Sequence, residues 1–221
     1  MSDRQLARVR ALLAKAESTT PEEAELLTAK AEELIVRHAL DAGLLDPGAV
    51  PPAIIVRRWA WSGELAIGRR RLVMAAVAAI PGAYALYNAT RDFQRVRVWA
   101  EQEATLDLVH SLLIQADAAL AFWWADQFKD SVFGRPGTRK ASFLWGFGVG
   151  VARRFVDRTS AAGPGAGLVL ADASRRVREH VEAGIQVTAG RPSAASDYVG
   201  FFDGIAAGED ADTGGRALAR A

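Results

Sequence analysis

The 221-residue chain contains no cysteine. This absence excludes disulfides, thiolate catalysis and zinc sites with cysteine ligands, and because it fits a reducing compartment we expect a cytoplasmic location. Histidine is also scarce, and His38, His110 and His180 form no HxxxH, HxH or HExxH pair. Zinc sites normally use closely spaced ligands. We therefore expect no metal site, and a packed or interface role for His38, which continues a helical stripe.

Motifs for membrane insertion, nucleotide binding and nucleophilic catalysis are missing as well. No apolar run approaches the roughly 18 residues of a membrane span and no signal peptide is recognisable, so we expect no membrane partner. The segment GFGVG at 146–150 lacks the Lys-Ser/Thr of a P-loop and is not a GxGxxG, and the chain has no GxSxG. We expect no cofactor and no catalytic residue, and the sequence leans away from an enzyme.

An acidic group near the C-terminus leaves a metal-dependent enzyme as a minor alternative. Its members are Asp197, Asp203, Glu209, Asp210 and Asp212. Carboxylates can bind a divalent cation. A solvated acidic helix end is the favoured interpretation, because no spacing among these residues singles out a site.

The first forty residues predict a helical hairpin, because apolar residues recur at helical spacing on both sides of one break. These residues are Leu6, Val9, Leu12, Leu13 and Ala16, then Ala24, Leu27, Ala31, Leu34 and Ile35. The break contains Thr20-Pro21-Glu22-Glu23, in which Thr20 can cap the second helix and Pro21 fits its first turn. The second helix is predicted to end near Gly43. We assign residues 1–45 to this hairpin, with the proline-rich segment 46–52 as a stiff connector.

The segment from Arg8 to His38 resembles a bacterial and phage family, domain of unknown function 2786. Its pattern is roughly a basic residue, then LLALAEST, then NPxEAxxAxxKAxxLxxKH. The residues that fit are Arg8, Leu12, Leu13, Ala16, Ser18, Thr19, Pro21, Glu23, Ala24, Ala29, Lys30, Ala31, Leu34 and His38. More weakly, segments 139–155 and 197–212 resemble later parts of proteins that carry this domain. The resemblance implies an actinobacterial or phage genome and no catalytic residues.

Residues 53–212 predict an α+β body, followed by a flexible tail at 213–221. Alternating patterns predict a strand at 53–62 and a β-hairpin with arms 84–89 and 95–100. Helical patterns cover 63–80, 103–128, 138–158, 172–183 and 196–211. The glycine-rich segment 163–167 is interpreted as a flexible loop and 168–170 as an additional short strand. The expected sheet is therefore antiparallel, with three or four strands covered by four or five helices.

Glycines inside two predicted helices indicate a close contact between helices. Gly200, Gly204 and Gly208 are four residues apart and share one helix face. Because glycine costs a helix about 1 kcal/mol relative to alanine, its presence there usually marks a close backbone approach. We predict that this face packs against Gly146 and Gly150.

The strongest charge asymmetry lies in residues 51–100, where eight arginines stand against Glu64 and Asp92, a net charge of +6 in a chain whose total is +1. If the strand at 53–62 pairs with the strand at 95–100, six residues are expected on one side of the sheet. They are Arg57, Trp59, Trp61, Arg95, Arg97 and Trp99. Guanidinium groups interleaved with indoles suit single-stranded nucleic acid, through phosphate contact and base stacking. The alternative is that a helix buries the tryptophans while the arginine stems extend to solvent.

Two further basic groups are candidates for the same role. Arg69, Arg70 and Arg71, with Arg57 and Arg58, either contact a phosphate backbone or form a solvated helix face with carboxylate partners. The other group is Arg135, Arg139, Lys140, Arg153, Arg154 and Arg158. For that group an ordinary solvated surface is the favoured interpretation.

These patterns support two hypotheses about function. The leading one is an uncharacterised, non-enzymatic accessory protein that binds DNA or RNA through the Arg/Trp sheet face and the Arg69–Arg71 cluster. The alternative is a protein–protein interaction or self-assembly module, a homo-oligomer included. In that case the N-terminal hairpin or the glycine faces form the contact, and Trp123, Trp124 and Trp145 supply buried anchors.

Overall fold

The structure is a computed structural model that describes residues 3–16, 23, 26–27, 30–31, 34, 53–90, 93–127, 136–161, 164–188 and 194–211. Within these residues the fold is α+β, as expected. The helices are α1 (Asp3–Ala16), α3 (Ala66–Val77), α4 (Glu103–Gln127), α5 (Pro136–Ala161), α6 (Pro164–Gly184) and α7 (Tyr198–Glu209). The strands are β1 (Ile55–Ser62), β2 (Ala83–Ala89) and β3 (Phe93–Ala100).

The three strands form an antiparallel sheet in the order β1-β3-β2, so β3 is central. β2 and β3 are the predicted hairpin, with Ala89 opposite Gln94. Gly63, at φ +80°, directly follows β1, and Gly82, at φ +67°, directly precedes β2. Both are in the left-handed region, which glycine enters without steric cost, so the chain can turn sharply at these two strand ends.

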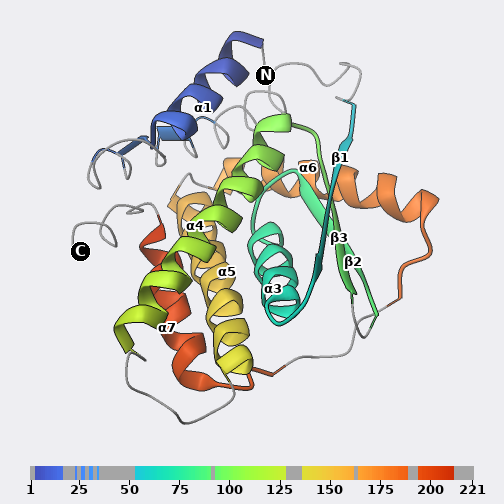
Figure 1. Ribbon diagram of the computed structural model, residues 1–221. Coiled ribbons are helices and arrows are strands. Elements are labelled where there is room, and N and C mark those ends of the chain that lie inside the picture. The colour runs from blue at the N-terminus through green and yellow to red at the C-terminus, as the bar shows by residue number, and fades with distance from the viewer. Residues whose placement is uncertain are drawn as a thin grey trace.

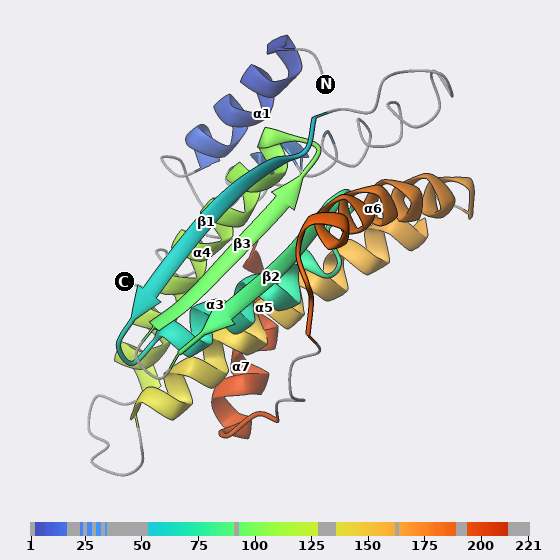
Figure 2. The same ribbon diagram turned by 90° about the vertical axis from the view of Figure 1, so that its right-hand side faces the viewer.

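Helices are layered mainly on one side of the sheet. α3 contacts all three strands, α4 contacts β3, α5 packs against α3, and α7 packs against α5. Figure 1 shows this succession, with α3, α5 and α7 progressively farther from the strands. α6 contacts β2 and β3 from the opposite side and lies across one end of the sheet (Figure 2). The sheet therefore has an inner face covered by helices and an outer face that α6 covers in part.

The predicted glycine contact between α5 and α7 is confirmed. A Cβ atom added at Gly146 would lie 2.0 Å from the carbonyl oxygen of Phe201, and one added at Gly204 would lie 2.1 Å from that of Phe143. Gly150, Gly200 and Gly208 approach backbone of the opposite helix in the same way. GFGVG is thus a helical contact segment, and a Cβ atom added at Gly148 would lie 2.5 Å from the carbonyl oxygen of Leu72 in α3.

The N-terminal helices join the main apolar core. Val9 and Leu13 of α1 are buried in the same cluster as residues of α3, α4 and α5, and Ala31 and Leu34 belong to it too. The second predicted helix is described only at residues 23, 26–27, 30–31 and 34, all of which are helical. Its other residues, like the connector and the tail, lie outside the described part of the chain. The domain boundaries stay a prediction.

The start of α6 corrects the sequence analysis. Residues 164–167 were expected in a loop and 168–170 in a strand, but a continuous helix begins at Pro164. Proline has no N–H to lose at the first helical position and its fixed φ suits a helix. The glycine-rich composition therefore did not prevent a helix, and the described residues contain three strands rather than four.

α4 corrects the expectation that no segment approaches the length of a membrane span. Among the described helices it is the one long and apolar enough to cross a membrane by length and composition. Its side chains at Leu108, Val109 and Leu112 are buried in the core. Since core helices pass the same test, α4 is weak evidence for a membrane span.

Candidate nucleic-acid interface

The register of β1 and β3 divides the six predicted Arg/Trp residues between the two faces of the sheet. Directly opposite residues share a face, and Trp59 lies opposite Val96 while Arg58 lies opposite Arg97. Arg57, Trp59 and Trp61 are therefore on the inner face, and the other three, Arg95, Arg97 and Trp99, are on the outer face. The prediction that all six project from one side was wrong.

The inner-face members are engaged in the fold. Trp59 and Trp61 are half-buried and pack against the main core. Nη1 of Arg57 lies 2.9 Å from Oδ1 of Asp107 near the start of α4, and Glu103 is a second carboxylate neighbour at 3.9 Å. Trp59 and Trp61 are therefore partly covered, as in the alternative interpretation, but Arg57 ends at carboxylates of α4 instead of extending to solvent.

Trp99 is on the outer face but is not available for base stacking. Its side chain is 8% exposed and packs with Val177 and Val181 of α6. Beside it on β2, the ring of Tyr84 lies under the guanidinium of Arg178 at 5.5 Å. α6 therefore seals this end of the outer face.

The rest of the outer face is exposed and basic. Arg58, Arg95 and Arg97 are exposed, and Arg58 is a residue that the predicted face did not include. The guanidinium carbon of Arg95 lies 5.2 Å from the centroid of the Phe93 ring, which is 38% exposed. No described helix other than α6 covers this side of the sheet (Figure 2).

The strands themselves contribute no acid to this face, and a carboxylate that contacts it is Glu182 of α6, which accepts from the hydroxyl of Tyr84 at 3.0 Å. The outward positions of the strands hold Val56, Arg58, Ala60 and Ser62 on β1, Phe93, Arg95, Arg97 and Trp99 on β3, and Tyr84, Leu86 and Asn88 on β2. None of them is acidic, and no ion pair within the described residues involves Arg58, Arg95 or Arg97. Like charges directly opposite each other destabilise a sheet, and Arg58 lies directly opposite Arg97. We call Arg58, Arg95, Arg97 and Phe93 the outer basic face.

The Arg69–Arg71 cluster does not form one surface. Arg69 makes a two-pronged contact to Asp117 of α4, with Nε 3.1 Å from Oδ1 and Nη2 3.0 Å from Oδ2. The guanidinium of Arg70 lies over the ring of Tyr87 at 4.4 Å, and that of Arg71 lies over Trp145 at 4.8 Å. The three side chains diverge because successive helical residues point about 100° apart.

Most basic residues of α5 contact other elements of the same chain. Arg139 pairs with Asp197 at 2.8 Å, Arg153 pairs with Glu209 at 2.9 Å, and Arg154 donates to the carbonyl of Gly208. Lys140 lies over the ring of Trp124. Arg135 lies outside the described residues. These contacts tie α5 to its neighbours rather than presenting a separate basic surface.

The acidic and histidine residues have identifiable places. Asp197 caps α7 by accepting from the N–H of Gly200, and Asp203 accepts from Trp123 Nε1 at 2.9 Å. His110 and His180 are exposed on α4 and α6, while His38 and Asp212 lie outside the described residues. The described residues contain no group of three or more His, Asp or Glu side chains able to hold a metal.

The comparisons with known proteins identify the N-terminal segment alone. The model of a family described as protein of unknown function (DUF2786) matches residues 4–42. This confirms the resemblance seen in the segment from Arg8 to His38. No curated protein and no solved structure matches the chain. The match ends before 139–155 and 197–212, whose weaker resemblance stays a prediction.

Proposed function

We propose that this protein binds single-stranded nucleic acid through the outer basic face. The observation that carries the proposal is the opposed pair Arg58 and Arg97, with Arg95 two residues along the same strand and no acid at any outward strand position. Residues two apart on a strand are separated by about 6.7 Å and neighbouring strands by about 4.8 Å. Three guanidinium groups are therefore concentrated within a small, solvent-facing area.

The chemistry of this area favours phosphate over most other partners. Guanidinium groups bind phosphate oxygens in a two-pronged geometry. Phe93 adds an exposed aromatic ring on which a base can stack. A sheet surface with basic and aromatic residues suits an unpaired strand, whose bases are accessible, better than a duplex. The tryptophans contribute packing here instead of stacking.

The direct test is fluorescence anisotropy of labelled single-stranded DNA and RNA, and of duplex DNA, at several salt concentrations. We expect replacement of Arg58, Arg95 and Arg97 by glutamine to weaken single-strand binding by about tenfold or more. Each lost phosphate contact lowers the salt slope by about 0.7, so the triple variant should lose about 2 from that slope.

The matched control is a triple variant that removes the same net charge elsewhere. It replaces Arg8 of α1, Arg70 of α3 and Arg153 of α5 with glutamine, and none of these is on the outer face. We expect it to retain most of the affinity. Equal losses of affinity in both triple variants would mean that net charge alone causes the effect. Unchanged binding by the outer-face variant would refute the proposed interface.

Contact between copies of the chain is the second candidate. The hypothesis that copies associate through the glycine faces was wrong, because those faces contact each other within one molecule. The observation in favour of association is on the opposite side of α7, where Tyr198, Val199 and Phe202 are 68%, 56% and 61% exposed. Contiguous exposed apolar side chains are typical of interaction sites. A single monomeric species in sedimentation velocity over a wide concentration range would count against this candidate.

A further inference from the structure

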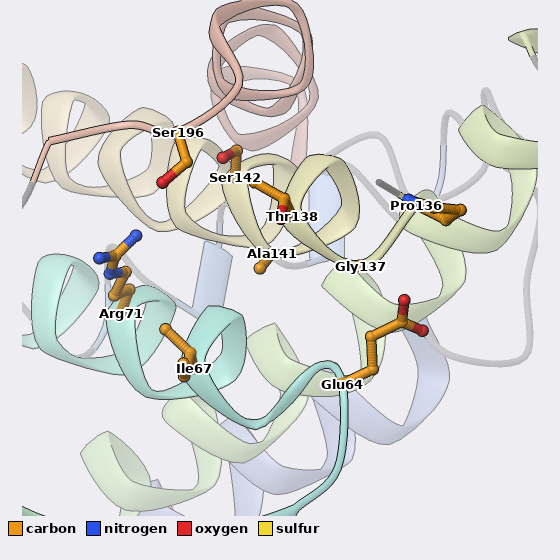
Figure 3. A pocket seen from close by; sticks show the side chains of 9 residues that line it. All are labelled: Glu64, Ile67, Arg71, Pro136, Gly137, Thr138, Ala141, Ser142 and Ser196. Atoms are coloured by element: carbon orange, nitrogen blue, oxygen red, sulfur yellow. The ribbon is translucent and has the colours of Figure 1, made fainter. Parts of the chain in front are cut away.

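A cavity of about 520 Å³ lies between α3 and α5, away from the outer basic face. Its size is within the range of roughly 300–1,000 Å³ that is usual for small-molecule sites. The lining includes Glu64, Ile67 and Arg71 from the α3 side, Thr138 and Ser142 from α5, and Ser196 from the segment before α7. Figure 3 shows Arg71 at one end of the cavity and Glu64 at the other.

Arg71 has no charged partner among the described residues, in contrast to Arg69, which pairs with Asp117. Its guanidinium is held over the ring of Trp145, and its Nε is buried with no hydrogen-bond acceptor in the described part of the chain. Burial, and then the neighbouring charge of Arg70, lower the pKa of Arg71. An oxyanion in the cavity would supply the missing charge to the guanidinium.

Hydroxyl groups stand at the same end of the cavity. Oγ of Ser142, a residue that is 1% exposed, accepts a hydrogen bond from the backbone N–H of Asp197 at 3.2 Å. Its own proton is then available for a ligand oxygen. Figure 3 shows the guanidinium of Arg71 directed toward the side of the cavity that carries Ser142 and Ser196. One cation and two hydroxyls from three separate segments therefore converge there.

Glu64 gives the opposite end of the cavity the opposite charge. It lies in the turn before α3, seven residues ahead of Arg71 in the chain. A Cβ atom added at Gly137 would lie 2.3 Å from Cγ of Glu64, so that side chain is held against the first turn of α5. No cation among the described residues pairs with it. A second negative charge on a ligand is unfavourable at this end, whereas an amine is favourable.

We propose that this cavity binds a small ligand whose phosphate or carboxylate group contacts Arg71, Ser142 and Ser196 and whose amine end faces Glu64. The site is separate from the outer basic face, and binding at either surface can be present without the other. Polyphosphates should bind less well than monophosphates, because Glu64 repels their distal charges.

The test follows the Arg71 Nε–H signal in nitrogen–proton NMR spectra of the full chain. The signal is assigned by its loss in Arg71→Gln. The probes are inorganic phosphate, acetate and O-phosphoethanolamine, each added at constant ionic strength against chloride. We expect a saturable shift of the signal with phosphate or acetate, and the stronger of the two identifies the preferred anionic group. Phosphoethanolamine should bind more tightly than phosphate, and Glu64→Gln should abolish that advantage.

The matched control is Arg70→Gln, which removes the same charge from the adjacent position but outside the cavity lining. Binding, read from the Ser196 amide, should weaken about tenfold or more in Arg71→Gln and less than about twofold in Arg70→Gln. Linear, unsaturated shifts, or equal losses in the two variants, would overturn the site. If Arg71→Gln fails to fold by circular dichroism, the exposed Ser196→Ala decides, read from the backbone amide of Ser142: unchanged affinity would overturn the site. No advantage for phosphoethanolamine would overturn the role of Glu64.

Discussion

The substitution Gly204→Ala tests the contact on which the helical layers depend. The added Cβ would lie 2.1 Å from the carbonyl oxygen of Phe143 and 2.8 Å from its carbonyl carbon. Ordinary contacts of a Cβ begin near 3.4 Å. The obstacle is backbone of α5, which cannot rotate aside as a side chain does. α5 and α7 must therefore separate by roughly 1 Å or bend, and either response loses close packing along the interface.

The expected cost exceeds the gain from a better helix former. Overpacking of this kind costs about 1–3 kcal/mol, with a backbone obstacle placing Gly204→Ala near the upper end. Alanine returns about 1 kcal/mol of helix propensity. We therefore expect a net loss of about 2 kcal/mol in the free energy of unfolding. For a chain of this length that loss lowers Tm by about 4–8 °C.

The control is Gly184→Ala at the end of α6, where an added Cβ meets nothing within 4 Å. This variant should be as stable as the parent or slightly more stable, because only the propensity difference remains. Both are measured by thermal and denaturant unfolding followed by far-UV circular dichroism. Combining Gly204→Ala with Gly146→Ala should cost less than the sum of the two, because the first substitution already separates the helices. A Tm for Gly204→Ala at or above that of Gly184→Ala would refute the close contact.

Two further predictions concern α7 and α6. Burial alone would raise the pKa of Asp197, but the hydrogen bond from the Gly200 N–H and the pairing with Arg139 outweigh it, so the pKa lies below its usual value. The charged Asp197 therefore stabilises the fold above the unfolded pKa of about 3.9, and this stabilisation is lost as the pH falls through the folded pKa. The difference in free energy of unfolding between the parent and Asp197→Asn, measured by denaturant titration, should disappear over that acidic range. A difference that does not depend on pH would contradict this. Trp99→Ala should cost about 3–5 kcal/mol in denaturant unfolding, because Trp99 is buried under α6; a loss below about 1 kcal/mol would mean that the ring is exposed.

Local patterns in the sequence predicted most elements because their signals are local. The helix expected at 103–128 is observed as Glu103–Gln127, and both arms of the expected β-hairpin are present. The start of α6 was missed for an equally local reason. A glycine-proline-glycine composition is typical of loops, yet Pro164 occupies the one helical position where proline costs nothing.

The candidate interface was harder to predict because it depends on register. In β1 both faces carry apolar residues, so its alternation did not reveal which face meets the core. β1 and β3 are also separated by α3 and β2, and no tight turn fixes their pairing. A shift of one residue in the pairing of two strands moves every side chain of one strand to the other face. The observed register differs from the expected one in this way, so Arg58 and not Arg57 lies beside Arg97. The cavity between α3 and α5 had no sequence signal, since its residues come from three separate segments.

Proximity in the sequence was therefore a poor guide to which arginines act together. Arg69, Arg70 and Arg71 are consecutive, yet the first contacts α4, the second β2 and the third α5. Arg58 and Arg97 are far apart in the chain and lie directly opposite each other. The useful distinction is whether a guanidinium has a carboxylate partner. Those with one, such as Arg57 and Arg69, hold elements of the fold together, so their removal should reduce stability before it affects any ligand. Arg58, Arg71 and Arg97 have no such partner among the described residues, and these are arginines that the two proposals assign to a bound anion.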